Sequence, residues 1–507
     1  MLPLSGKHSN AVNTTLLRAG LPGAPDFSPA AGPGARGNGG LSLRQMLICV
    51  ALAVVVATGT FWAAVRSNGE HSLVWSDGLA YFLYARSAVI DGDFDISNEY
   101  ADMARRVPKD SKLMEPLRVW TTRDVVTGKV KAPWPVGAGL VMAPFYAVGY
   151  GIERVVASAY GRDPDSYGLI PQYAFGFGAL AYMLAGFFAM VKCYWYVAPA
   201  AAVPAAMAVI LAGPMLFYTF FNPTMAHAPS FGLVAVLTLL WWQQWHKGTD
   251  PTRFAVIGLL SGILVTVRFQ NALFGLLPLS LLFHEARRSG PAHAARCAAA
   301  GVIAGALPLL VLLPPLAELH LPGSTAPGNG SVVVGNYPID PRSPFFVDVL
   351  FSSRHGAFYW APLLGVGALG LLIAARRHAW AWVALAAVAA NVWLIGGLGI
   401  QGTAPVHGVP ANIDWNNHWN GAPSFGMRYL AECGPLLGIG LARVFSLVAT
   451  RVGAVAIWVA LAGFTVWNGL LVLAYGFETI SRSYAQTYFQ LITGAGRAVA
   501  RLAGLGS

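Results

Sequence analysis

The sequence predicts an all-α polytopic membrane protein with about 11 transmembrane helices and further juxtamembrane helices on the outer face. Three observations predict this fold class. Of the 507 residues, 56% are hydrophobic and only 11% are charged, whereas a soluble domain has about 25% charged residues. The apolar residues come in blocks of about twenty, the length of helix that crosses about 30 Å of hydrocarbon. Basic residues gather in short loops beside these blocks, as in cytoplasmic loops of membrane proteins.

The net charge of +11 does not indicate a nucleic-acid partner, because the basic residues flank apolar segments and do not form a binding stripe. The four cysteines lie in or beside apolar segments and show no CxxC spacing. The sequence therefore predicts neither a disulfide framework nor a zinc site.

The chain divides into three regions. Residues 1–45 are rich in Gly, Ala, Pro and Ser, which predicts a disordered cytoplasmic segment. Residues 46–475 form the predicted transmembrane domain, which begins with a retained span at 47–65 and continues into a first outer loop at 66–168. Residues 476–507 are expected to form an interfacial tail.

The remaining apolar segments are expected to be helical. They are 136–152, 169–191, 199–220, 228–245, 254–267, 271–283, 297–317, 357–375, 379–399, 427–446 and 453–475. If the basic loops share one side of the membrane, then 136–152 and 169–191 cannot both cross it. Because 136–152 is short and interrupted by Pro144, we expect it to lie on or dip into the outer face. The segment 254–283 is expected to be a hairpin with its outer turn at Arg268–Asn271.

Acidic residues in the first outer loop allow two interpretations each. Asp77, in Trp-Ser-Asp-Gly, begins an amphipathic segment, where it either caps a helix or acts as a general base at the membrane surface. Asp91, Asp93 and Asp95 alternate around Gly92 and either end a helix or hold a divalent cation through carboxylate oxygens.

Lys131 lies near the end of the charged part of the first outer loop, and the remaining expected outer loops hold few cations, so each of those suggests a site for an anion. Lys131 lies in Lys-Ala-Pro-Trp-Pro and either binds a phosphate or snorkels to the interface. Arg268 lies at membrane depth and requires an anionic partner, either a carboxylate or a lipid phosphate. Arg354 opens the segment 357–375, and Arg428 opens the segment 427–446.

Polar and aromatic residues on the same face suit sugar recognition, although they also occur as turn residues or as the aromatic belt of a membrane interface. The candidate substrate-binding residues are Asn222, His227, Gln270, Asn271, His355, Trp415 and His418.

In order, these features resemble the GT-C superfamily of polyprenyl-phosphate-sugar-dependent glycosyltransferases. The likeness is strongest to bacterial enzymes related to the protein O-mannosyltransferases and the aminoarabinose lipid A transferases. It rests on the acidic motif at Asp77 and the lysine of Lys-Ala-Pro-Trp-Pro, followed by spans with polar outer turns, and covers roughly residues 45–475. Two departures stand out. Ser-Asp-Gly replaces the usual Asp-Glu pair, and the second outer turn carries Asn222 and His227 where an aspartate is common.

The resemblance implies a specific reaction. Asp77 would deprotonate an acceptor hydroxyl, while Lys131 and Arg268, with Arg354 or Arg428, would bind the donor phosphate. A monosaccharide would move with inversion from a polyprenyl-phosphate sugar donor to a glycolipid, polysaccharide or protein acceptor, and the donor tail would lie among membrane lipid. The resemblance implies a bacterial plasma (inner) membrane protein with its active site on the extracytoplasmic face. No cofactor is required, although metal-dependent relatives keep a divalent cation at Asp91–Asp95 open.

Two other classes remain as alternatives. A polytopic transporter or a lipid-linked glycan flippase usually places ionisable residues in mid-span and shows paired repeats, neither of which the sequence displays. A lipid-linked glycan ligase or polymerase shares the donor chemistry, but its largest outer loop is expected late in the chain.

Overall fold

The computed structural model describes residues 41–67, 71–107, 122–123, 128–131, 134–310, 332–334, 337–343, 345–398 and 423–505. Most of the predicted disordered segment, and the outer-loop residues Trp415 and His418, lie outside these ranges. The helices, in chain order, are α1 (Leu43–Ser67), α2 (Asp77–Arg86), the π-helix η2 (Ser87–Asp91), α3 (Ser97–Arg106), α5 (Val136–Ala159), α6 (Leu169–Trp195), η3 (Pro199–Ala201), α7 (Ala202–Leu211), α8 (Met215–Phe220), α9 (His227–Lys247), α10 (Pro251–Val267), η4 (Phe269–Gly275), α11 (Leu276–Ser289), α12 (Pro291–Leu309), α14 (Phe346–Phe351), α15 (Ala357–Trp360), α16 (Pro362–Ala375), α17 (Ala379–Gly396), η7 (Arg428–Cys433), α18 (Gly434–Arg451), α19 (Ala454–Gly476) and α20 (Tyr488–Leu502).

Two small antiparallel hairpins accompany these helices. Strand β1 (Thr122–Arg123) pairs with β2 (Val130–Lys131), and β3 (Val332–Val334) pairs with β4 (Tyr337–Ile339). In the first hairpin Lys131 lies opposite Thr122. The prediction of an all-α fold therefore holds for the bulk of the described chain, to which these short hairpins are minor additions.

Seven helices of the described chain are long and apolar enough to cross a membrane. They are Leu43–Arg66, Val136–Ala159, Leu169–Trp195, Pro291–Leu309, Ala379–Gly396, Arg428–Arg451 and Ala454–Gly476. Three shorter apolar helices are Pro199–Leu211, Pro251–Val267 and Pro362–Ala375. The prediction of a multi-pass helical membrane protein is confirmed, while the figure of about 11 spans stays a prediction.

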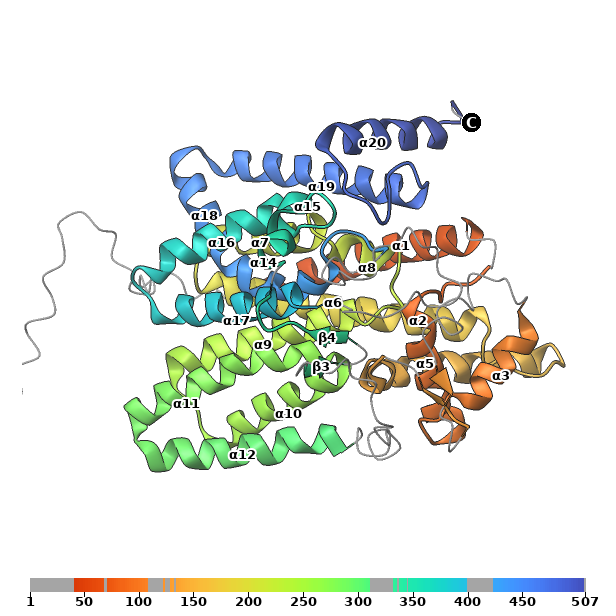
Figure 1. Ribbon diagram of the computed structural model, residues 1–507, viewed down its shortest axis with the longest axis horizontal. Helices are drawn as coiled ribbons and strands as arrows, with labels where there is room; N and C mark the ends of the chain where they lie inside the picture. The colour runs from red at the N-terminus through yellow and green to blue at the C-terminus, as the bar shows by residue number, and fades with distance from the viewer. Residues whose placement is uncertain are drawn as a thin grey trace, which may run out of the picture. The chain divides into compact units, whose positions relative to one another are not determined.

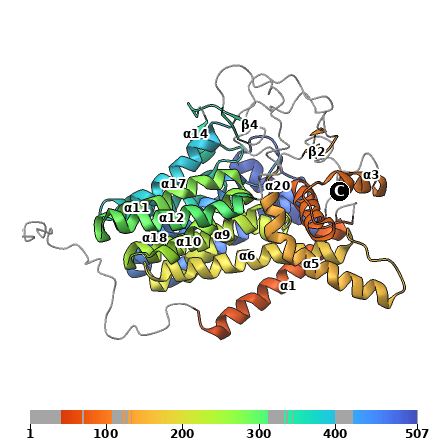
Figure 2. The same ribbon diagram turned by 90° about the horizontal axis from the view of Figure 1, so that it is seen from below.

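The long helices pack side by side through small residues. Helices α9 to α12 run alongside one another, and α3 lies beyond one end of this group (Figures 1 and 2). In the α10–α12 pair, a Cβ added at Gly258 would lie 2.1 Å from the carbonyl oxygen of Gly301. The α16–α18 pair repeats this arrangement, with 2.1 Å from Gly370 to the carbonyl oxygen of Gly440. Only a residue without a side chain permits such backbone approach, as at helix interfaces in membranes.

Prolines break three segments that the sequence predicts as continuous. The segment 199–220 becomes α7 and α8, with Gly213 and Pro214 between them. The segment 357–375 becomes α15 and α16, and Pro362 is the first residue of α16. The segment 427–446 begins with the 3₁₀ helix η7, and Pro435 lies in the first turn of α18. Proline lacks a backbone donor, so it is favoured at a helix start and disfavoured in a helix interior.

The predicted surface helix at 136–152 is longer in the structure. Helix α5 continues to Ala159, although Pro144 lies inside it. The buried Glu153 accepts hydrogen bonds from Arg162 at 2.5 Å and from the backbone nitrogen of Asp165 at 3.1 Å. Glu153 therefore belongs to the helix and anchors the turn after it, and the boundary predicted at residue 152 is wrong. Its position on or across the membrane stays a prediction.

The C-terminal tail contains the helix α20. Thr487 and Gln490 form a capping box at its start. One face packs on α19 and the turn after it, where Arg497 and Arg501 donate hydrogen bonds to the carbonyl oxygens of Thr479 and Phe477. These basic residues therefore hold the helix against the end of α19, and a placement at the membrane interface remains the expectation.

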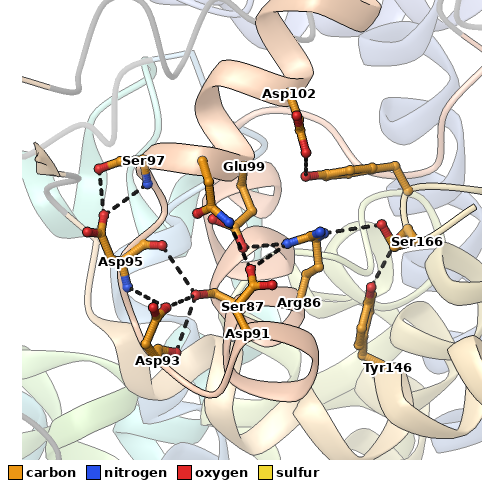
Figure 3. A network of polar contacts seen from close by, with 12 residues as sticks. Arg86, Ser87, Asp91, Asp93, Asp95, Ser97, Glu99, Asp102, Tyr146 and Ser166 are labelled. Atoms are coloured by element: carbon orange, nitrogen blue, oxygen red, sulfur yellow. Dashed lines mark hydrogen bonds and ion pairs between the residues drawn. The ribbon is translucent and has the colours of Figure 1, made fainter.

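An ionic network organises the first outer loop (Figure 3). One nitrogen of the Arg86 guanidinium lies 2.7 Å from both Asp91 and the fully buried Glu99. The Arg86 guanidinium also lies 4.9 Å from the ring centre of Tyr167. The sequence offered no sign of this role for Arg86, because its partners lie on the π-helix η2 and on α3.

The three aspartates weighed as metal ligands make separate local contacts. Asp91 pairs with Arg86, while Asp93 accepts hydrogen bonds from Ser87 at 2.6 Å and from the backbone nitrogen of Asp95 at 3.1 Å. Asp95 accepts from the backbone nitrogen of Ser97 at 3.0 Å, at the start of α3. No cluster of three His, Cys, Asp or Glu side chains suited to a metal occurs in the described residues. Local contacts at the end of η2 and the start of α3 therefore engage all three carboxylates, while the expectation that no metal is required stays a prediction.

Glu99 and Asp91 both contact Arg86, but their pKa values shift in opposite directions. The pKa of Glu99 is raised to about 8, mainly by burial and also by its contact with Asp91, with Arg86 offsetting part of the shift. For Asp91, burial acts upward, but hydrogen bonds from Asn98 and Glu99 and the charge of Arg86 outweigh it and lower the pKa. Near neutral pH, Glu99 is therefore protonated and Asp91 carries the charge that balances Arg86.

This difference predicts a pH-dependent stability. The contribution of Glu99 is full below about pH 4.3, the ordinary value for glutamate in an unfolded chain, and is lost as the pH rises through about 8. Denaturant unfolding of the wild type in detergent is expected to show this loss between about pH 5 and pH 9. The neutral, isosteric Glu99→Gln variant is expected to lack it. Parallel curves for the two proteins would contradict a protonated Glu99.

Candidate functional site

Asp77 is the first residue of α2 but does not cap it. The N-cap position belongs to Ser76, whose φ of 57° is unusual for a residue other than glycine and whose side chain makes no capping hydrogen bond. The Asp77 carboxylate instead contacts a residue much later in the sequence: its Oδ2 accepts a hydrogen bond from Arg428 Nη1 at 3.1 Å. Of the two interpretations of Asp77, the structure excludes capping.

Gly78 allows α2 to dock where it does. A Cβ added at Gly78 would lie 2.2 Å from the hydroxyl of Thr224. Thr224 belongs to the turn between α8 and α9, in which Asn222 is also buried and accepts the Thr224 hydroxyl at 3.4 Å. Close contact between α2 and this turn thus places Asp77 beside the start of α9. Any side chain at position 78 would therefore collide with Thr224.

The start of α9 carries a second polar cluster, composed of His227, Arg268 and Glu432. Arg268 Nη1 lies 2.7 Å from His227 Nδ1 and 3.4 Å from Glu432 Oε1, and His227 Nδ1 lies 3.2 Å from the same oxygen. The Glu432 and His227 side chains are 1% and 2% exposed. Arg268 therefore has the anionic partner that its depth requires, and that partner is a carboxylate. The structure supports this interpretation of Arg268, although a guanidinium has five donors and can bind a phosphate as well.

His227 lies between a donor and an acceptor. Arg268 Nη1 is 2.7 Å from its Nδ1 and 3.1 Å from its Nε2, and Nδ1 is also 3.2 Å from Glu432 Oε1. A guanidinium only donates, so a ring nitrogen can accept from Arg268 only without a proton, whereas a nitrogen that bonds to Glu432 must carry one. The ring also stacks at 4.5 Å on Tyr218. His227 thus contacts both members of the Arg268–Glu432 ion pair.

Tyr429 lies between the Asp77–Arg428 pair and the cluster of His227, Arg268 and Glu432. Its ring centre lies 5.1 Å from the Arg428 guanidinium carbon and 5.7 Å from that of Arg268. The phenol of Tyr81, on α2, completes the group, since burial and the nearby Asp77 raise its pKa while both arginines partly offset this. The two arginines therefore both contact the Tyr429 ring and lie close to a protonated phenol that can donate a hydrogen bond.

The predicted polar turn of the α10–α11 hairpin serves mainly to hold this group together. Gln270 accepts from Arg268 Nη2 at 3.2 Å and donates to the carbonyl oxygen of Tyr429 at 2.8 Å. Asn271 donates to the Ser230 hydroxyl and to the carbonyl oxygen of Leu264, both at 2.9 Å. Both amides fix backbone segments, and a role for them in sugar binding stays a prediction.

The other predicted residues lie further from this group or outside the described side chains. His355 is fully buried, 5.9 Å from Trp360, whose ring lies 5.9 Å from Phe425. Phe425 in turn donates its backbone N–H to the Tyr218 hydroxyl, so an aromatic chain links the turn at Arg354–His355 to the site. The side chains of Lys131, Trp415 and His418 lie outside the described part, so their roles stay predictions.

Glu432 is the functional candidate that the sequence interpretation missed. It is the only acidic residue in the apolar segment 427–446, and an ionisable residue in a membrane span marks a functional site by default. The sequence Arg-Tyr-Leu-Ala-Glu shows this signal. It does not show that Glu432 pairs with Arg268, because the two residues are 164 positions apart (432 − 268).

No family model and no curated protein matches the sequence. Among solved structures, the chain is similar to ArnT from Cupriavidus metallidurans. The structure of that protein in the apo state aligns with a TM-score of 0.48 and 12% sequence identity, over 90% of this chain and 70% of ArnT. The structure of ArnT bound to undecaprenyl phosphate aligns with a TM-score of 0.43 and 16% identity, over 90% and 71% of the two chains. Likeness at this level carries no residue roles, so the function of this chain has to be argued from its own side chains.

Proposed function

We propose that this protein is a membrane glycosyltransferase that moves a monosaccharide from a polyprenyl-phosphate donor to an acceptor hydroxyl, with inversion. One observation carries the proposal: a carboxylate, Asp77, lies 3.1 Å from one of two arginines that both contact the ring of Tyr429. A base beside cations suits a reaction in which an acceptor loses a proton while a phosphate leaves. The proposed setting is the extracytoplasmic face of a bacterial plasma membrane.

Each residue has a defined role in this reaction. The acceptor hydroxyl oxygen attacks the anomeric carbon as its proton passes to Asp77. The bond from that carbon to the phosphate oxygen breaks, and the electron pair leaves with the polyprenyl phosphate. Arg428 and Arg268 stabilise the charge that develops on this phosphate, and Lys131 is proposed to assist them. The required charge sits on protein side chains, and no redox step is involved.

The decisive experiment is turnover by the purified full-length protein in detergent. The substrates are labelled polyprenyl-phosphate monosaccharides, with cell-envelope extract as the source of glycolipid, polysaccharide and protein acceptors. Release of polyprenyl phosphate together with label transfer to one acceptor class would support the proposal and name the acceptor. Failure across the whole donor panel would count against it and favour a transporter.

Arg428 provides a prediction about donor binding. The Arg428→Gln variant is expected to bind polyprenyl phosphate at least about tenfold more weakly than wild type. A hydrogen bond to a charged group contributes about 1.5–3 kcal/mol, and about 1.4 kcal/mol corresponds to tenfold. Equilibrium binding in detergent measures this. Arg105→Gln removes an exposed arginine of α3 and is the matched control. Equal affinity in Arg428→Gln and wild type would remove Arg428 from the phosphate site.

A further inference from the structure

We infer that Arg428 is a switch shared by Asp77 and the donor phosphate, so that the carboxylate and the phosphate compete for its guanidinium. This inference rests on the proposed function and adds a coupling between the base and the donor site to it. The Asp77–Arg428 pair thereby becomes a regulatory element, because a bound phosphate draws Arg428 away from Asp77.

Arg428 occupies the base. Asp77 Oδ2 accepts its hydrogen bond from Arg428 Nη1 at 3.1 Å, with side chains 20% and 13% exposed. Arg428 thus engages one lone pair of this carboxylate, and a donor phosphate would require the same guanidinium.

Arg428 also has donor capacity left over. Its Nε is buried and makes no hydrogen bond within the described part of the chain. Leaving such a donor unsatisfied is costly. Asp77 occupies one guanidinium nitrogen, whereas a phosphate group presents three oxygens and can engage more than one at once. Arg428 is therefore better matched to a phosphate than to its present partner.

Arg268 differs from Arg428 in how firmly its partners hold it. Three side chains engage Arg268, namely Glu432 at 3.4 Å, His227 at 2.7 Å and Gln270 at 3.2 Å. Arg428 is engaged by the Tyr429 side chain and by one carboxylate, Asp77, which a phosphate can replace. Arg268 is thus the fixed element of the phosphate site, and Arg428 is the element that changes partner.

Competition for Arg428 has a measurable consequence. If Asp77 and the phosphate exclude each other on Arg428, removing the Asp77 charge must strengthen phosphate binding. Asp77→Asn is therefore expected to bind undecaprenyl phosphate about fivefold or more tightly than wild type, the lower end of typical coupling between two sites. In the Arg428→Gln background, Asp77→Asn is expected to bring no such gain, because the shared residue is absent.

The experiment is equilibrium binding of undecaprenyl phosphate to the full-length protein in detergent, for wild type, both single variants and the double variant. Asp102→Asn is the control for loss of one negative charge, since Asp102 pairs with the exposed Arg105. It is expected to bind as wild type does. Inorganic phosphate is the competitor that distinguishes a lipid phosphate from a free one, and it is expected not to compete at equal concentration.

Three results would overturn the switch. These are equal affinity in Asp77→Asn and wild type, a gain that persists without Arg428, and a gain matched by Asp102→Asn. Efficient competition by inorganic phosphate would overturn the assignment to a lipid donor. Sugar transfer by the wild type together with any of these results would refute the switch and leave the proposed function standing. Absence of both binding and transfer would refute the two together.

Discussion

Replacing Asp77 by asparagine is expected to lower sugar transfer by about 10²–10⁴-fold, the usual contribution of a positioned general base. The amide has the size of the carboxylate and still reaches Arg428, but it cannot accept the proton of the acceptor hydroxyl. The measurement is release of polyprenyl phosphate at saturating donor, with binding measured on the same preparation. Binding is expected to persist in the variant, which separates loss of chemistry from loss of the site.

A control distinguishes this role from a general effect of charge. Asp102→Asn removes a carboxylate of the same outer region that pairs with an exposed arginine, and it is expected to retain transfer. Wild-type turnover by Asp77→Asn would show that another group is the base. The first alternative to examine would then be Glu432, the other carboxylate of the site.

Replacing Glu432 by glutamine is expected to give the largest loss of stability of any single substitution in the site. Glu432 is 1% exposed and lies 3.4 Å from Arg268. Removing one partner of a buried ion pair leaves the other charge uncompensated and costs about 3–5 kcal/mol. The free energy of unfolding in detergent, from denaturant titration, measures this change.

Two further variants show whether the loss comes from the buried charge. Arg268→Gln combined with Glu432→Gln removes both charges and is expected to recover much of the stability, since residues in contact are not additive. Glu478→Gln breaks a partly exposed pair with Arg482 and is expected to change stability by less than about 1 kcal/mol. A Glu432→Gln protein as stable as wild type would mean that Arg268 draws its compensation from elsewhere.

The sequence identifies the residues of the site far better than their contacts. Arg268 and Arg428 stand out because charges are rare in the later outer turns, and Asp77 stands out at the start of an apolar helical segment. Glu432 carries a similar signal as the only acidic residue of its apolar segment, whereas Tyr81 carries none, because an aromatic residue is ordinary in such a helix. The aspartates at 91–95 show the same division, because the sequence leaves a metal site and a helix end as alternatives and only the structure shows their hydrogen bonds to local backbone and side chains.

The boundaries of the helices show a similar division. Hydropathy predicts that 199–220, 357–375 and 427–446 are apolar and helical, which is correct. It does not predict that the helices are interrupted at Pro214 or Pro362, or that η7 is a 3₁₀ turn. Whether a helix continues or is interrupted depends on whether neighbouring residues can form hydrogen bonds with the exposed backbone groups.

The sequence by itself determined that this chain is a multi-pass helical membrane protein and which few ionisable residues it carries among apolar segments. The fold class and the rarity of these residues both follow from the free-energy cost of placing polar groups in hydrocarbon. This cost applies to each residue separately, so it can be recognised from composition and spacing. Only the tertiary structure decided that Asp77 meets Arg428, 351 residues away, and that Glu432 and His227 hold Arg268. Such pairs depend on helix packing, set by contacts such as Gly78 against Thr224, and no local pattern records them.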